Sequence, residues 1–400
     1  MLFQRKKYIE RIRPFMGKDI IKVVVGQRRV GKIYFLAQIR DELLATNPAI
    51  HALFINKELY EFDAIKDYHD LIAFVQSHEK QDSPCALFID EIQEINNFEK
   101  ALRHFQAKGV YDIYISGSNA RIMSGELATF LSGRYVEIDM YSLSFPEFKS
   151  FHNLSATKET LQKYIKFGGL PYLLHLDLEE SVVYDYLKSI HSSILLKDIV
   201  ARHQIRNVAF LENLVKYLAN NVGNLISAKK ISDYLKSQRQ SMSPNIVLNY
   251  LEYLRDAFFT HNVKRMDIVG KKLFEIGEKV YFQDIGLKHA VVPFRPDMIG
   301  HVLENLVFNH LKYLGYTVHI GHLYGKEIDF IATRADEKIY VQVAYLLADQ
   351  EMIQREFGNL LAIKDNYRKI VVSFDEWSGG TYEGIEHQSI LEFLSAEALE

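Results

Sequence analysis

Short apolar runs alternate with amphipathic stretches through the first third of the chain. Runs rich in β-branched and aromatic residues predict strands at residues 20–25, 51–55, 85–89, 111–116 and 135–139. Helical periodicity between these runs predicts helices at residues 32–44, 68–78 and 98–107. Because several strands are almost wholly apolar, we expect both faces of the sheet to be covered. The pattern predicts an α/β fold with a parallel sheet flanked by helices.

The middle of the chain, residues 143–225, is mainly helical in pattern. The segment FGGLPYLL at 167–174 interrupts it, because glycine and proline punctuate helices. Ser227 caps one further predicted helix, and Ser243 and Pro244 begin another. Two β-like runs follow, at residues 259–263 and 272–282. Two helices followed by a hairpin predict a winged-helix arrangement.

The last quarter returns to a mixture of helices and strands. Helices are predicted at residues 301–314 and 350–366, and strands at 317–320, 327–333, 338–344 and 369–374. The changes of pattern divide the chain into three predicted domains, at residues 1–142, 143–295 and 296–400.

Composition sets broad limits on the class of protein. With 400 residues, 48% hydrophobic and 25% charged, the chain has the make-up of a globular protein of two or three domains. No apolar run approaches the roughly 20 residues needed to span a bilayer, and the charged amino terminus lacks a signal peptide. With a single cysteine, Cys85, these features predict a cytoplasmic protein. A net charge of −3 argues against indiscriminate coating of nucleic acid.

A glycine-rich turn connects the first predicted strand to a helix. It has the Gly-x4-Gly-Lys spacing of a Walker A loop and consists of Gly26, Gln27, Arg28, Arg29, Val30, Gly31 and Lys32. Glycines let successive backbone N–H groups point at phosphate oxygens, and the helix adds the positive end of its dipole. Lys32 would bridge the β- and γ-phosphates of ATP. The alternative, an ordinary turn before a surface helix, fits the strand–loop–helix context less well.

The residue after Lys32 departs from this motif. Ser or Thr normally stands there and coordinates Mg²⁺, whereas this chain has Ile33. Tyr34 is the nearest hydroxyl, but it is one residue out of register on the helix. We expect Ile33 and Tyr34 to lie beside the nucleotide, and we expect ATP to bind more readily than it is hydrolysed.

Two carboxylates, Asp90 and Glu91, follow the third apolar strand in CALFIDEIQEI. The carboxyl ends of strands in open α/β sheets face the ligand. Downstream of a Walker A loop, the pair predicts a Walker B strand, in which Asp90 holds Mg²⁺ and Glu91 polarises the attacking water. The alternative is a strand that simply ends in acidic turn residues.

The next two strands carry weaker signals. Small polar side chains end YDIYISGSNA, and Ser116, Ser118 and Asn119 would either sense the γ-phosphate or form a Gly-Ser turn. Arg134, just before the fifth strand, would either reach phosphate in its own or a neighbouring subunit or lie solvated at the surface. Residue chemistry alone leaves these alternatives open.

The chain as a whole closely resembles a family of prokaryotic AAA-type ATPases, in which a region of unknown function follows the ATPase domain. The resemblance rests on the order of five motifs: GQRRVGK, LFIDEIQEI, ISGSNA, LSGRYVEIDMYSLSFPEF and FGGLPYLL. It implies a sensor at Ser118 or Asn119 and a phosphate-facing Arg134. The candidate catalytic residues are then Lys32, Glu91, Asn119 and Arg134. The family's physiological role is poorly established, so the resemblance leaves the target and the oligomeric state open.

The carboxy-terminal third is similar to a PD-(D/E)XK nuclease-like fold. Glu304 lies on its first predicted helix and Asp329 in the strand EIDFIA, while Gln342 and Ala344 stand where Glu-x-Lys belongs. A working nuclease of this type needs two carboxylates for the metal and a lysine near the attacking water. We therefore expect the fold without the chemistry, with Glu304 and Asp329 as ordinary structural carboxylates.

The predicted winged helix is basic. Between Ile226 and Lys272 there are nine Lys or Arg and four Asp or Glu, a balance of +5. Such residues would contact DNA phosphates, while Asn245 and Asn249 would read base edges from the second helix. The basic positions on or near the helices and the wing are Lys229, Lys230, Lys236, Arg239, Lys264, Arg265, Lys271 and Lys272. The alternative is a protein-interaction or packing module whose lysines are merely solvated.

These observations support one leading functional hypothesis and one main alternative. In the first, an AAA-type ATPase uses ATP and Mg²⁺ to rearrange carboxy-terminal domains that contact double-stranded DNA, alone or as a homo-oligomer. In the second, the protein is a non-hydrolysing, nucleotide-gated scaffold or regulator that binds DNA or protein. A third hypothesis, an ATP-fuelled nuclease, is disfavoured by Gln342 and Ala344. None of them involves a membrane.

Overall fold

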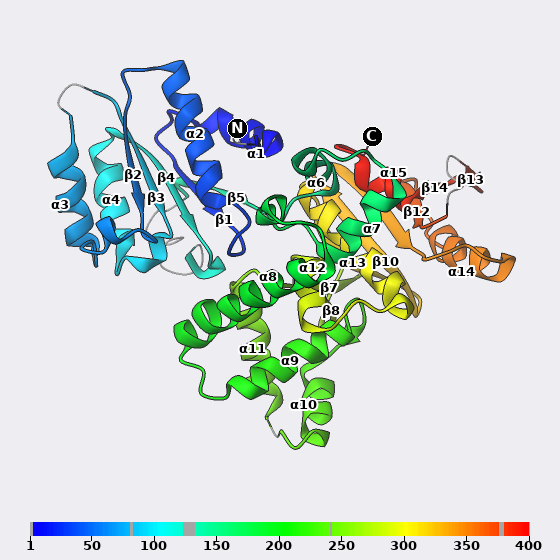
Figure 1. The fold of residues 1–400 in the computed structure, drawn as a ribbon. Coiled ribbons are helices and arrows are strands. Elements are labelled where there is room, and N and C mark those ends of the chain that lie inside the picture. Colours follow the sequence, from blue (N-terminus) through cyan, green and yellow to red (C-terminus); the bar gives the residue numbers. More distant parts are fainter. Residues whose placement is uncertain (1–2, 81–82, 123–132, 241, 376–379, 400) are drawn as a thin grey trace. The chain divides into compact units, whose positions relative to one another are not determined.

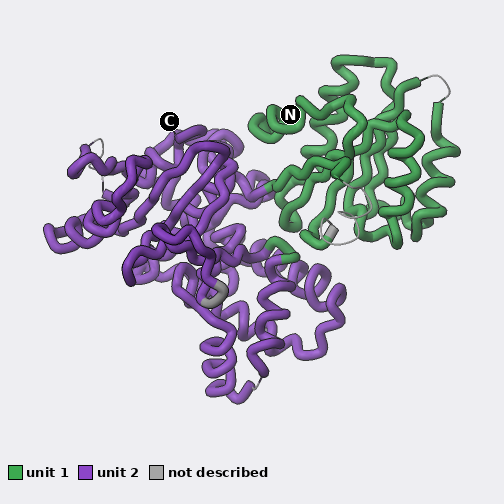
Figure 2. The backbone as a smooth tube through the Cα atoms, turned by 180° about the vertical axis from the view of Figure 1, so that it is seen from behind, with its two compact units in different colours: residues 1–140, 256–258 green, residues 141–255, 259–400 purple. Residues whose placement is uncertain are grey.

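The computed structural model describes residues 3–399 except 81–82, 123–132, 241 and 376–379, and the chain forms two compact units (Figure 1). The first unit comprises Met1–Met140 and Asp256–Phe258, and the second comprises Tyr141–Arg255 and Phe259–Glu400 (Figure 2). Among the described residues, no helix has both the length and the apolar character needed to cross a membrane.

The first unit is built on a five-stranded sheet with the order β2-β3-β4-β1-β5, in which all neighbouring strands are parallel. Its strands are β1 (Ile21–Val25), β2 (His51–Asn56), β3 (Cys85–Asp90), β4 (Tyr111–Gly117) and β5 (Tyr135–Asp139). The predicted strands are confirmed, with ends that differ by no more than one residue. Because β4 lies between β1 and β3, the carboxyl ends of these three strands meet at one edge.

Helices cover both faces of this sheet. They are α1 (Lys6–Ile12), α2 (Lys32–Thr46), α3 (Tyr68–His78) and α4 (Phe98–Lys108), of which α1 was not predicted. Val25 and Ile89 belong to the core beneath α3 and α4. Phe88 points the other way and stacks with Phe54 and Tyr114. Helix α2 covers this face of the sheet (Figure 1). Burial on both sides explains the unbroken apolar strands.

The second unit begins with helices, as predicted: α6 (Phe145–His152), α7 (Lys158–Phe167), α8 (Glu180–Ser193) and α9 (Val208–Asn220), with a π-helix over Ile194–Ala201. The FGGLPYLL segment forms a tight turn after α7. Gly168 has a φ of +75°, and a Cβ on Gly169 would lie 2.3 Å from the Leu143 carbonyl oxygen. The Asp284 carboxylate accepts a 2.9 Å hydrogen bond from Gly169 N and caps α12 (Ile285–Val291). The glycines are therefore required by close packing of backbone and carboxylate.

A small strand, two helices and a hairpin follow α9. They are β6 (Leu225–Ile226), α10 (Ala228–Ser237), α11 (Pro244–Asp256), β7 (Thr260–Asp267) and β8 (Leu273–Phe282). The Ser227 side chain accepts a hydrogen bond from Lys230 N at 3.3 Å, which confirms its predicted role as a helix cap. Helix α11 begins at Pro244, as predicted, and ends at Asp256.

A nine-stranded sheet runs through the rest of the second unit, in the order β13-β14-β12-β11-β10-β9-β7-β8-β6. The remaining elements are α13 (Ile299–Tyr313), β9 (Thr317–Leu323), β10 (Lys326–Arg334), β11 (Glu337–Val343), α14 (Gln350–Leu361), β12 (Arg368–Ser373), β13 (Thr381–Tyr382), β14 (Ile385–Ser389) and α15 (Ile390–Ser395). Strands β7 and β9 pair in parallel, so the segments 143–295 and 296–400 share one sheet and one compact unit.

Candidate functional site

The loop between β1 and α2 adopts a conformation that depends on its glycines. Gly26 leaves β1 with a φ of +155°, and a Cβ there would lie 2.2 Å from the carbonyl oxygen of Met140. Arg29 and Gly31 also have positive φ, at 72° and 96°. A turn that contains left-handed residues can point successive backbone N–H groups to a common side, which forms an anion-binding hollow. The loop thus has the local geometry that the Gly-x4-Gly-Lys spacing predicts.

Lys32 lies at the centre of this loop. It is the first residue of α2 and is only 4% exposed. Its Nζ donates to the carbonyl oxygens of Gly26 at 3.0 Å and Gln27 at 3.1 Å, and it lies 3.6 Å from Glu91 Oε1. The loop therefore curls around its own ammonium group, which leaves a concentrated positive charge at a helix amino terminus.

Gln27 adds a second signal for a ligand. Its side chain is fully buried, and within the described residues neither amide atom has a hydrogen-bond partner. A buried amide without partners is unfavourable unless a bound group or water completes it. On the outer side of the loop, Arg28 Nη1 pairs with Glu58 Oε1 at 3.0 Å. A polar ligand such as a polyphosphate fits the loop better than an apolar one.

The carboxylates at the end of β3 meet the hydroxyls at the end of β4. Ser116 donates to the Asp90 carboxylate, and Ser118 donates to Glu91 Oε2 at 2.9 Å. The Gln93 side-chain amide donates to the same Glu91 oxygen. Asp90, Glu91 and Lys32 thus lie together at the carboxyl edge of the sheet, as parallel strand order requires.

The two carboxylates have different proton affinities. Burial and the neighbouring charge of Glu91 raise the pKa of Asp90 to about 6. Burial also disfavours the charged form of Glu91, yet the charges of Lys32 and Arg28 hold its pKa below the usual value. At neutral pH both carboxylates are therefore ionised next to one ammonium group, and a cation is the natural partner for Asp90.

The other two candidate catalytic residues lie differently. Asn119 is buried, but its Oδ1 accepts from Arg121 N at 2.8 Å within its own turn. Arg134 is exposed, and its carbonyl oxygen accepts from Ile21 N at 3.0 Å, at the start of β1. Because β1 and β5 run in parallel, Arg134 lies at the amino edge of the sheet and Lys32 at the carboxyl edge. The structure therefore does not bring Arg134 to the loop of its own chain.

Ile33 and Tyr34 lie along a groove beside the loop. The groove has a volume of about 440 Å³, and Phe54, Leu59 and Phe62 contribute to its wall. Tyr34 is 61% exposed. Within the described residues no cluster of three or more His, Cys, Asp or Glu side chains is arranged to hold a metal ion. Since Mg²⁺ in nucleotide sites takes most ligands from phosphates and water, Asp90 fits it only together with a bound nucleotide.

In the second unit, the structure brings Glu304, Asp329 and Gln342 together around a lysine that sequence reasoning missed. Lys279 Nζ on β8 lies 2.7 Å from Glu304 Oε1, 2.7 Å from Glu327 Oε1 and 3.6 Å from Asp329 Oδ1. Gln342 Oε1 accepts from Asp329 N at 3.3 Å.

The electrostatics of this cluster are those of a closed ion-pair network. Although burial opposes it, the charges of Glu304 and Asp329 hold the pKa of Lys279 above its ordinary value. Burial and the charge of Glu304 raise the pKa of Asp329. The nuclease-like motif would place a lysine where this chain has Ala344. Lys279 supplies an ammonium group to the cluster from a different strand, β8. No local sequence pattern indicates this contact, because β8 and the carboxylates are distant in sequence.

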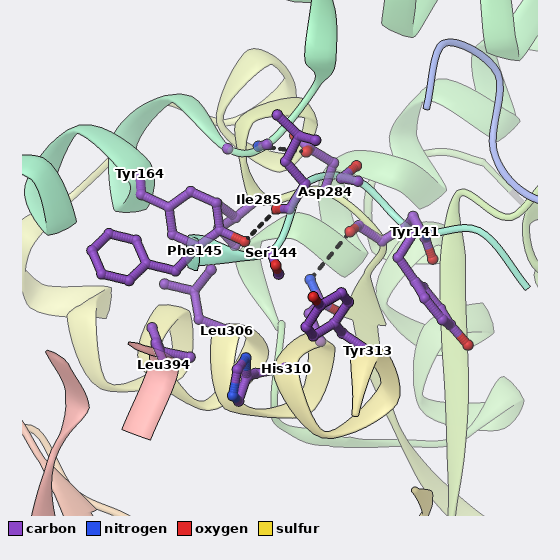
Figure 3. Close-up of a pocket in the computed structure, with 16 residues that line it drawn as sticks. Tyr141, Ser144, Phe145, Tyr164, Asp284, Ile285, Leu306, His310, Tyr313 and Leu394 are labelled. Carbon is purple, nitrogen blue, oxygen red and sulfur yellow. Dashed lines mark hydrogen bonds between the residues drawn. The ribbon is translucent and has the colours of Figure 1, made fainter. Parts of the chain in front are cut away.

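A small cavity in the second unit lies beneath the FGGLPYLL turn, where Tyr141, Tyr164, Asp284 and His310 contribute to its wall (Figure 3). The Tyr164 hydroxyl donates to the Leu143 carbonyl at 2.8 Å across it. The cavity has a volume of about 20 Å³, which is enough for one water molecule and too little for a substrate. It is therefore not the functional site.

Two family models match parts of the chain. Residues 18–149 match the family described as an AAA domain, and residues 158–298 match a domain of unknown function, DUF8612. An uncharacterized protein of Haemophilus influenzae is 37% identical over 401 residues, which cover 98% of each chain. An uncharacterized protein of Methanocaldococcus jannaschii is 32% identical over 360 residues, which cover 86% of this chain and 79% of its own.

Among solved structures, the chain is similar to a Walker-type ATPase of Pyrococcus abyssi. The match covers 73% of this chain and 96% of the other, with a TM-score of 0.50 and 14% sequence identity. The fold of the first unit and the family match define residues 18–149 as a domain of the AAA type. The chain belongs to the same family as the Haemophilus and Methanocaldococcus proteins. In this chain the DUF8612 match follows the AAA match.

Proposed function

We propose that this protein binds ATP with Mg²⁺ between the β1–α2 loop and the end of β3, hydrolyses it, and uses the nucleotide state to rearrange its carboxy-terminal part. The proposal rests on Lys32. Its buried ammonium group donates to two carbonyl oxygens of the loop, and a positive charge held in this way attracts the phosphates of a triphosphate. Lys32 and the loop N–H groups would hold the β- and γ-phosphates. Bound Mg²⁺ would supply charge neutralisation, and Asp90 is the residue that would hold it.

The hydrolytic step would depend on Glu91. Its depressed pKa keeps it ionised, so it can accept a proton from the attacking water as it orients that water. Ser118, bonded to Glu91, is better placed than Asn119 to report the γ-phosphate. Arg134 would act only on the nucleotide of a neighbouring subunit, since it lies at the opposite edge of its own sheet. That role requires a homo-oligomer.

Nucleotide titration and turnover of the wild type and Lys32→Ala test this function. We expect the wild type to bind ATP with Mg²⁺ and Lys32→Ala to bind it at least about tenfold more weakly, because a charge-assisted contact to phosphate is lost. Turnover above the Lys32→Ala background supports hydrolysis. Binding without turnover supports the alternative, a nucleotide-gated regulator, and no binding at all refutes both.

We further propose that α10 and α11 contact double-stranded DNA. The order α9, β6, α10, α11, β7 and β8 matches a winged helix. Lys229, Lys230 and Lys236 are exposed on α10, and Asn245 and Asn249 are exposed on α11. The hairpin is a weaker part of this surface, because β7 is paired with β9.

Charge-reversal variants test the DNA proposal. Lys229→Glu with Lys230→Glu is expected to weaken duplex binding by more than tenfold and to reduce its dependence on salt concentration. Lys163→Glu with Lys188→Glu, which reverses two exposed charges on α7 and α8, is the matched control and should leave binding nearly unchanged. If both double variants lose affinity equally, non-specific charge explains the binding and the proposed surface is refuted.

A further inference from the structure

The segment before β1 contains an arginine that is buried against the nucleotide loop. Arg5 is only 3% exposed, although it lies near the amino terminus and in a run of charged residues. Its Nη1 donates to the carbonyl oxygen of Val30 at 3.2 Å. Val30 immediately precedes Gly31 and Lys32, so Arg5 holds the part of the loop that leads into α2.

A second set of contacts fixes the Arg5 backbone. Arg5 N donates to Gln38 Oε1 at 3.2 Å, and Gln38 Nε2 donates to the Phe3 carbonyl at 2.6 Å. The Arg5 guanidinium also lies 4.6 Å from the centre of the Tyr8 ring, which packs edge-on against Phe35. The segment is therefore held on α2 by several contacts, and the Arg5 side chain also reaches the loop.

We propose that Arg5 is a positioning residue of the nucleotide site, and that residues 3–12 are a working part of that site. This inference rests on the proposed ATP binding. The matched AAA region begins at residue 18, so nothing in that match covers this segment. By holding the Val30 carbonyl, Arg5 keeps the peptide unit ahead of Gly31 oriented, and with it the N–H groups that face the phosphates. A guanidinium donor suits the role because it stays charged and rigid when buried.

Reciprocal coupling follows from this contact. If the segment stabilises the phosphate-binding form of the loop, then a bound triphosphate stabilises the docked form of the segment by the same factor. Nucleotide binding would therefore stabilise the docked position of α1 (Lys6–Ile12) as well as the loop that holds the phosphates.

ATP titration of matched variants tests the role of Arg5. Arg5→Met keeps an unbranched stem against Tyr8 but removes the donor, and we expect it to weaken ATP binding about tenfold. Arg13→Ala is the control, because it removes the exposed 2.7 Å pair between the same segment and Glu42 without touching the loop. Gln38→Leu removes the backbone anchor and is expected to change ATP affinity less than about twofold. Equal affinity in Arg5→Met and the wild type, or equal losses in Arg5→Met and Gln38→Leu, would overturn the proposal.

Hydrogen exchange on the unaltered protein provides a readout that does not depend on a variant folding. We expect ATP to slow amide exchange in residues 6–12 of the wild type and to have no effect in Lys32→Ala. Unchanged exchange in the ATP-bound wild type would reject the coupling. If the wild type binds no ATP, the proposed function itself fails, whereas ATP binding that ignores Arg5 removes only this inference.

Discussion

At the scale of single residues, the proposed nucleotide site has all the glycines and the lysine of the loop motif but lacks one hydroxyl that would coordinate Mg²⁺. Ile33 occupies the position from which a hydroxyl normally reaches Mg²⁺, and it lines an apolar groove with Phe54 and Phe62. In the proposed site, Asp90 would supply an oxygen ligand to the metal, and the Ser116 hydroxyl donates a hydrogen bond to its carboxylate. Such a site is expected to bind nucleotide through the loop and to hold the metal weakly.

Ile33→Thr is therefore expected to raise Mg²⁺-dependent ATP turnover by about tenfold, because it restores one metal ligand. Steady-state turnover over a Mg²⁺ titration measures the change. Tyr34→Phe removes the neighbouring hydroxyl and is the matched control, with turnover expected to stay as in the wild type. An unchanged rate in Ile33→Thr would mean that residue 33 does not limit metal binding.

Asp90 predicts a pH dependence of metal-assisted binding. Its pKa is raised to about 6 by burial and by Glu91, so the carboxylate is ionised above that pH and protonated below it. A proton competes with Mg²⁺, and the Mg²⁺-dependent part of ATP affinity should fall about tenfold per pH unit below pH 6. Titrations between pH 5 and 8 measure this slope. In Asp90→Asn the slope should be absent, and its persistence would assign the titration to another group.

At the scale of elements, the hairpin β7–β8 is joined to the carboxy-terminal segment by a buried ion-pair network. Lys279 on β8 meets Glu304 on α13 and Asp329 on β10. Burying the Lys279 ammonium and its carboxylate partner is favourable only while the two remain paired. The network thus specifies how the hairpin, the helix and the strand pack together within the second unit.

Lys279→Met is expected to lower the free energy of unfolding by about 3–5 kcal/mol, because it leaves buried carboxylates without a cation. Burial and the charge of Glu304 already raise the pKa of Asp329 to about 8, and without the ammonium its charged form is still less favourable, so the loss should shrink as the pH falls from 8 to 5. Urea unfolding at both pH values measures it. Adding Glu304→Gln should recover part of the stability, and a loss that is equal at both pH values would exclude charge as the cause.

At the scale of the whole molecule, the chain consists of two compact units with separate cores. Core residues from β1, β3 and β4 lie in the first unit, whereas a second cluster around Tyr340, Phe357 and Val371 lies in the other. A ligand of the loop binds directly to the first unit only. We therefore expect it to raise the free energy of unfolding of the first unit and to leave that of the second unchanged.

Calorimetry is therefore expected to resolve two unfolding transitions, of which ATP with Mg²⁺ raises one. At a ligand concentration one hundred times Kd, the stabilisation of the first unit is about 2.7 kcal/mol. Lys32→Ala should abolish the shift, and Lys279→Met should lower only the other transition. A single transition that ATP raises as a whole would contradict independent units.

The sequence predicted the parts of the site that local chemistry determines. Gly26 to Lys32 form a turn before a helix, as expected, because turn, charge and helix start are adjacent in the chain. The hydrogen bond from Ser116 to Asp90 was not predicted and depends on the neighbouring positions of β3 and β4 in the sheet. The resemblance implied that Arg134 faces the phosphates of a nucleotide in its own or a neighbouring subunit. Because Arg134 precedes β5, which is parallel to β1, it lies at the end of its own sheet opposite to Lys32. Contacts of Arg5 and Lys279 depend on long-range packing, which no local pattern encodes.

The parallel pairing of β7 with β9 also bears on how the chain is made. As synthesis proceeds from the amino end, the edge of β7 stays open until β9 has left the ribosome. An open strand edge invites pairing with other nascent chains. While residues 267 to 317 are being made, β7 is therefore open to such pairing, and β9 closes its edge once it has emerged.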